Sequence, residues 1–171
     1  VGGKNLMDFF LRIEARLMEV IRGLLGFAMI LMVILNLVNA AGRYAGTPIF
    51  TGADELLVFG MIWIVMIGAI VTTRDRKHLS IDVFPKRFKK RLRLVFNMII
   101  GGITASLSIF IAFHSLDFIE KISAIGQTSM GLGIPMAIPH LAVFIGFSGI
   151  ALVSSVLAIK DLRGVLFESK E

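Results

Sequence analysis

Residues 56–93 decide the fold. Residues 56–73 are LLVFGMIWIVMIGAIVTT and residues 74–93 are RDRKHLSIDVFPKRFKKRLR. The first part has 18 residues without an acid or a base, and a helix needs about 20 apolar residues to cross the ~30 Å hydrocarbon core of a bilayer. The second part carries nine Lys and Arg, and basic clusters beside an apolar run contact anionic lipid headgroups. Together they predict a membrane span followed by a loop at the membrane surface.

Three further stretches lack Asp, Glu, Lys and Arg: residues 23–42, 94–116 and 122–159. The first two each fit one crossing, whereas the third is too long. Its glycines and prolines predict a loop over 126–133 and a helix over 135–159. We therefore expect an all-α integral membrane protein whose four transmembrane helices cover 23–42, 56–73, 94–116 and 135–159 in a single membrane domain, residues 1–171.

The composition excludes several classes. Of 171 residues, 56% are hydrophobic and 18% are charged, against about 25% charged in typical soluble domains. These values exclude a disordered chain, a nucleic-acid-binding domain and most soluble enzymes. The chain has no cysteine, which excludes disulfides, thiolate metal sites and cysteine nucleophiles. The net charge is +6. The basic residues lie between the apolar runs, so membrane lipids are their expected partners.

Sixteen of the 18 Lys and Arg lie on the N-terminal flank, in the basic loop 74–93 and in the C-terminal tail. The two outer connections hold only Arg43 and Lys121. Basic residues concentrate on the cytoplasmic side, so both termini are predicted to be cytoplasmic. The first apolar run is longer than the 7–15 residues of a signal-peptide core, and we expect it to be a retained span.

Residues 4–22 place apolar side chains at a spacing of three or four, with Arg12 and Arg16 on the other side. This pattern predicts an amphipathic helix in the plane of the membrane interface. The alternative is that the segment extends the first span into the cytoplasm.

A polar cluster is predicted at the outer ends of the first two spans. Asn36, Asn39 and Arg43 share one helical face, and the next span begins with Asp54 and Glu55 after a possible N-cap at Thr51. Arg43 could meet either acid. The cluster then contacts a periplasmic partner or a large neighbouring subunit, or it is an ordinary interfacial pair.

The exit of the second span places Arg74, His78 and Asp82 four residues apart. His78 and Asp82 could form a base–orienter pair, but no nucleophile or metal partner lies nearby. A capped helix end or a structural lock between subunits fits better. The cations that follow are lipid-headgroup candidates: Lys86, Arg87, Lys89, Lys90, Arg91 and Arg93.

No acid or base lies in the middle of a span, where an ion-coupled carrier usually places one. His114 and His140 lie near one membrane face without a third ligand. We therefore expect a scaffold with no catalytic, cofactor-binding or metal-binding residues.

The order of motifs resembles the small membrane subunit (DctQ-type) of TRAP transporters, the tripartite ATP-independent periplasmic family. The motifs are Asn39-Ala-Ala-Gly-Arg43-Tyr44, Asp54-Glu55, Trp63, Gly68-Ala69, Arg74 and His78-Leu-Ser-Ile-Asp82. The similarity covers roughly residues 15–160 and is concentrated in residues 39–85.

The resemblance implies a sodium-coupled secondary transporter for organic acids, such as sialic acid, a keto acid or a dicarboxylate, in the bacterial inner membrane. A separate large subunit would hold the substrate and sodium sites and move as an elevator. This chain would scaffold that subunit and help dock the periplasmic substrate-binding protein. By the same resemblance, the subunit-interface or structural residues would be Asn39, Arg43, Asp54, Glu55, Trp63, Arg74, His78 and Asp82.

Two other functions remain open. A small homo-oligomeric transporter or channel would need a polar pore face, begun by Asn36, Asn39 and Thr72 or Thr73. A small membrane enzyme would use His78 with Asp82, or His114 with His140.

Overall fold

The computed structural model describes residues 2–46, 52–75 and 90–167, and the side chains of residues 13–46, 52–75 and 92–166. It contains α1 (Gly2–Tyr44), α2 (Ala53–Arg74), α3 (Lys90–Ala124) and α4 (Ala137–Phe167). Each of the four includes a segment long and apolar enough to cross a membrane. The described residues hold no strand beyond an isolated bridge between Thr128 and Pro135. The predicted helical class and the four apolar helices are therefore present.

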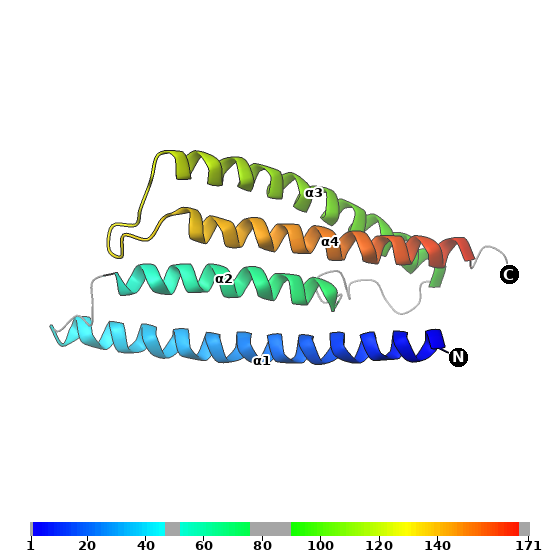
Figure 1. Cartoon of the computed structure of the whole chain (residues 1–171), viewed down its shortest axis with the longest axis horizontal. Helices are drawn as coiled ribbons and strands as arrows, with labels where there is room; N and C mark the ends of the chain where they lie inside the picture. The colour runs from blue at the N-terminus through cyan, green and yellow to red at the C-terminus, as the bar shows by residue number, and fades with distance from the viewer. Residues whose placement is uncertain (1, 47–51, 76–89, 168–171) are drawn as a thin grey trace.

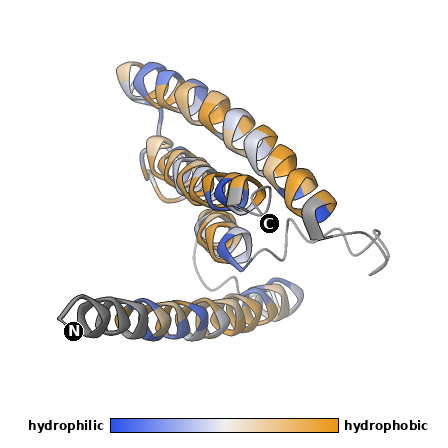
Figure 2. Ribbon diagram, turned by 90° about the vertical axis from the view of Figure 1, so that its right-hand side faces the viewer, coloured by the Kyte–Doolittle hydropathy of each residue, from blue (hydrophilic) through white to orange (hydrophobic). Residues whose placement is uncertain are grey.

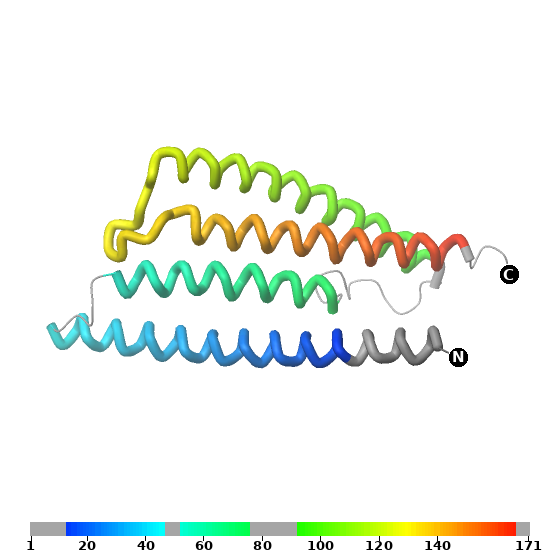
Figure 3. Tube along the Cα trace, in the orientation of Figure 1, coloured from blue at the N-terminus to red at the C-terminus, as the bar shows by residue number. Residues whose placement is uncertain are grey.

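The helices run alternately up and down, so α1 begins and α4 finishes at the same end of the molecule (Figures 1 and 3). We call this end the basic end, because it carries Arg16, Arg22, Arg74, Arg93 and Lys160. The opposite end, which we call the loop end, holds the α3–α4 connection, residues 125–136.

The four helices form an open row in the order α3, α4, α2, α1. The substantial contacts join α3 to α4, α4 to α2, and α2 to α1. Figures 1 and 2 show the same order from two directions, with α1 at one edge and α3 at the other. The chain therefore does not close into a four-helix bundle, and it exposes broad apolar faces.

Packing between these helices relies on small side chains. Along α3, Gly101, Ala105, Ser108 and Ala112 are buried at a spacing of four, three and four residues. A Cβ added at Gly101 would stand 3.2 Å from the Cβ of Ala158 on α4. In lipid, apolar surface gains little from burial against another helix, so close van der Waals contact between small residues holds spans together.

Large apolar side chains point outward instead. Phe27 on α1 is 67% exposed, Phe113 on α3 is 68% exposed and Leu152 on α4 is 71% exposed. The hydropathy colouring in Figure 2 shows apolar residues along all four helices. This arrangement suits a protein surrounded by lipid or by another membrane protein.

Helix α1 is continuous over 43 residues, which corresponds to about 65 Å, twice the thickness of a hydrocarbon core. No break separates residues 4–22 from the first span. The structure therefore does not show a separate interfacial helix. The described arrangement is the alternative, in which the amphipathic segment extends the first span at the basic end.

Two predicted helix starts differ from the structure. The N-cap of α2 is Gly52, with φ of 95°, instead of Thr51, and Thr51 lies outside the described residues. A positive φ favours glycine, and a Cβ at Gly52 would also approach Leu132 Cγ to 2.7 Å. Helix α4 begins at Ala137, after Pro135, so Pro139 is the proline in its first turn, where a missing N–H is tolerated.

Candidate functional site

The first polar cluster joins α1 to α2 at the loop end, and we call it the outer clamp. The Asn39 Nδ2 donates a hydrogen bond to Asp54 Oδ1 at 2.8 Å, and the Arg43 Nη1 lies 3.4 Å from Asp54 Oδ2. Asn39 is only 4% exposed. Asp54 lies in the first turn of α2, where the helix dipole favours negative charge. Of the two acids proposed for Arg43, the structure selects Asp54.

Glu55, the other acid, faces the α3–α4 connection. Its Oε1 accepts from the Gly131 N–H at 2.8 Å and its Oε2 accepts from the Leu132 N–H at 2.9 Å. Gly131 also packs against α2, because an added Cβ would stand 2.7 Å from the Gly52 Cα. Sequence reasoning missed this contact. Its partners are 76 and 77 residues away, and they contribute backbone groups that no side-chain pattern marks.

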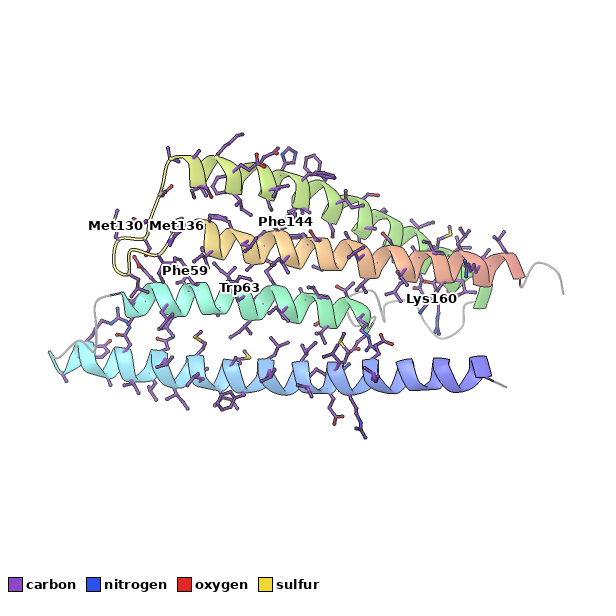
Figure 4. All side chains as sticks on the ribbon, viewed as in Figure 1. Phe59, Trp63, Met130, Met136, Phe144 and Lys160 are labelled. Carbon is purple, nitrogen blue, oxygen red and sulfur yellow. The ribbon has the colours of Figure 1, made fainter. Side chains whose placement is uncertain are left out.

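The connection itself has a defined shape. Ser129 N–H donates to Ile134 O at 2.8 Å, and Met136 N–H donates to Gln127 O at 3.0 Å. The Ser129 hydroxyl also accepts from the Ile134 N–H at 3.2 Å. Met130 stands at its tip (Figure 4) and is fully exposed. The loop end thus carries a folded hairpin held by a carboxylate of α2.

A second polar cluster, the inner clamp, joins α1 to α2 at the basic end. The Arg22 Nη2 lies 2.6 Å from each carboxylate oxygen of Asp75. The Arg74 guanidinium bonds Glu14 Oε1 from Nε at 3.1 Å and from Nη2 at 2.9 Å. Arg74 was a predicted structural residue, whereas its partners were not identified. The Arg22–Asp75 pair could have been predicted from the sequence. Arg22 comes just before the first apolar run and Asp75 just after the second, so the two residues lie at the same end of two antiparallel spans.

Between the two clamps, α1 meets α2 along a narrow apolar seam. The α1 side chains less exposed than their neighbours recur at a spacing of three and four: Met18, Ile21, Leu25, Ala28, Met32 and Leu35. Met32 fills the space that a side chain at Gly60 of α2 would occupy. This spacing is that of a two-helix seam.

The other predicted residues are only partly described. Trp63 is half-buried on α2, one turn after Phe59 (Figure 4). Arg93 is exposed at the start of α3. His78, Asp82, Lys86, Arg87 and Lys89 lie outside the described residues, as do the side chains of Lys90 and Arg91. Their assigned roles stay predictions.

The polar groups named for a pore or an enzyme are placed as follows. Thr72 and Thr73 donate to Gly68 O and Ala69 O of their own helix, both at 2.7 Å. His114 packs edge-on against Phe110, and His140 packs edge-on against Phe118. Within the described ranges, no group of three or more His, Asp or Glu residues is arranged to hold a metal ion. Thr72, Thr73 and Asn39 therefore all form hydrogen bonds within the chain, whereas Asn36 is exposed.

Comparison with known proteins identifies the family of this chain. Residues 29–164 match the family described as tripartite ATP-independent periplasmic transporters, DctQ component. The chain is also 27% identical over 128 residues to the isethionate TRAP transporter permease protein DctMQ of Oleidesulfovibrio alaskensis. That match covers 71% of this chain and 20% of the relative, so the chain spans about a fifth of the relative's length. The family match extends over most of the chain, from the second half of the first apolar segment to α4, and the chain therefore belongs to the DctQ component family of TRAP transporters, a family of transport components.

Proposed function

We propose that this chain scaffolds a large elevator-type transport subunit in a sodium-coupled TRAP transporter of the bacterial inner membrane. The observation that carries the proposal is the open row, since four membrane helices in a row present a long apolar wall to a neighbour. The clamps at both ends of the α1–α2 contact and the Glu55 contact with the hairpin keep that wall in one shape. A stationary support for a moving subunit needs this kind of rigidity.

The proposal places the basic end in the cytoplasm and the loop end in the periplasm. The Lys and Arg distribution supports this orientation. Residues 4–22 then continue α1 through the headgroup region, where Arg16 and Arg22 lie nearest to anionic lipid, and the cations of residues 86–93 are expected at the same surface. At the other side, the hairpin with Met130 at its tip stands where a periplasmic substrate-binding protein would approach.

The substrate class belongs to the proposal too. We expect an organic anion, such as a carboxylic acid, whose sodium and substrate sites lie in the large subunit. The relative named for isethionate, an organic sulfonate, supports an anionic substrate. No cofactor is assigned to this chain.

Purification of the tagged chain from native membranes in a mild detergent tests the scaffold role. We expect a much larger polytopic protein to copurify in a fixed ratio. Sodium-dependent uptake in proteoliposomes should require both chains and the binding protein. Recovery of the chain alone as a defined homo-oligomer, with flux in liposomes, would instead support the small transporter or channel.

A further inference from the structure

Asn36 is an exposed amide at membrane depth. It lies on α1 three residues before Asn39, about 5 Å of helix below the nearest residue of the outer clamp. Its side chain is exposed, and among the described residues it has no hydrogen-bond partner. A polar group facing hydrocarbon without a partner is unfavourable, so polar residues in spans usually face protein. The hydroxyls of Thr72 and Ser106 avoid this cost, because each donates a hydrogen bond to a backbone carbonyl of its own helix.

Asn36 belongs to a stripe with the spacing of a helix–helix contact. The stripe consists of Gly26, Met29, Val33, Asn36 and Ala40. Each of them directly follows a residue that faces α2, so the stripe lies beside the α1–α2 seam. Its members are separated by three, four, three and four residues, and all but the half-buried Ala40 are exposed. We call it the Asn36 stripe.

The stripe combines an exposed amide with a small residue at each end. Gly26 has no atom within 4 Å of where a Cβ would stand, and Ala40 is also small. Met29 and Val33 of the stripe are larger and exposed, as is Phe27 on the rest of α1. Small residues around a polar one allow two membrane helices to approach closely and hydrogen-bond. A single amide in such a seam also fixes the register of the partner.

We propose that the Asn36 stripe is a second helix-packing face, and that its occupant is a transmembrane helix of the large subunit. That helix presents small residues opposite Gly26 and a hydrogen-bonding side chain opposite Asn36. Helix α1 would then lie between α2 and the partner. The proposal rests on the proposed scaffold function. The relative named as permease protein DctMQ supports the occupant, because four fifths of its length lies outside the part matched by this chain.

Photo-crosslinking in native membranes tests the face. A photoreactive amino acid is placed singly at Met29 or Val33 on the stripe, and at Phe27 or Ile34 as controls, in the complete transporter. We expect an adduct with the large subunit from the stripe positions and a several-fold weaker one from the controls. An adduct with a second copy of this chain from the stripe, or large-subunit adducts only from the controls, would overturn the proposal.

Two glycines provide a matched pair for copurification. Gly23 and Gly26 both have open space around them, but only Gly26 lies on the stripe. Gly26→Leu should reduce the copurified large subunit several-fold, as should Asn36→Leu, whereas Gly23→Leu should leave it unchanged. Equal yields from all three variants would refute the stripe while leaving the scaffold function intact. If the unaltered chain copurifies no large subunit, the scaffold function itself fails.

Discussion

The α1–α2 contact and the α3–α4 contact are built differently. Helices α3 and α4 approach closely through small residues, as at Gly101 and Ala158. Helices α1 and α2 meet along a narrow seam of larger side chains and are joined at both ends by polar clamps. Van der Waals contact along the whole length makes the first pair rigid. The second pair depends on a few directional bonds, which leaves most of α1 available to lipid or to another protein.

The largest expected effect comes from enlarging a residue in the α3–α4 contact. Gly101→Leu forces a side chain against Ala158 and should lower the free energy of unfolding by about 1–3 kcal/mol, the usual range for overpacking. Thermal unfolding in detergent measures it. The neighbouring Gly102→Leu is the control, because nothing lies within 4 Å of Gly102. Equal losses from both variants would show that the small-residue contact does not hold α3 to α4.

The outer clamp comes next. Asn39→Leu removes the hydrogen bond to the well-exposed Asp54 carboxylate and should weaken the α1–α2 contact by about 1 kcal/mol. Spin labels on introduced cysteines near the loop ends of α1 and α2 report the separation, since the chain has no cysteine of its own. Asn36→Leu, one turn away, should leave the distance distribution of the isolated chain unchanged. A broadened distribution in both variants would mean that the clamp is not specific.

The inner clamp should have a smaller effect. Arg22 has 49% of its side chain exposed, so its pair with Asp75 is screened and is worth at most about 1 kcal/mol. Arg22→Asp and Asp75→Arg should each loosen the basic ends of α1 and α2, and the double variant should restore them. Label distances at low and high salt measure this. A double variant as loose as the single ones would indicate that the two residues do not act as a pair.

The smallest expected effect is at Glu14, whose bond to Arg74 is half exposed. Glu14→Gln should change the free energy of unfolding by a few tenths of a kcal/mol. It should also speed hydrogen exchange of the backbone before Arg22, because this contact holds the projecting part of α1 beside α2. Glu19→Gln is the control, since Glu19 is exposed and has no ion-pair partner among the described residues. Indistinguishable exchange in the two variants would remove Glu14 from the clamp.

Sequence patterns predicted the features that depend on short stretches. Charge-free runs located the four apolar helices, and the shared face of Asn39 and Arg43 next to an acidic helix start pointed to the outer clamp. The Glu55 contact was not predictable in this way, because Gly131 and Leu132 contribute only backbone N–H groups. The continuous α1 was predicted only as the alternative to a separate interfacial helix, since amphipathicity does not show whether a helix bends. The row order depends on which small faces fit together, and several helices carry such faces.

The row order has a consequence for biosynthesis. Helix α4 is translated after the other three, yet it lies between α2 and α3. Helices α1 and α2 can pack against each other before the fourth helix enters the bilayer, whereas α3 cannot reach its final neighbour until then, because α3 has no extensive contact with α2. Only then does the hairpin come within reach of Glu55. The packing of α3 and α4 into the row is therefore the later step of assembly, and the hairpin that closes onto α2 marks its completion.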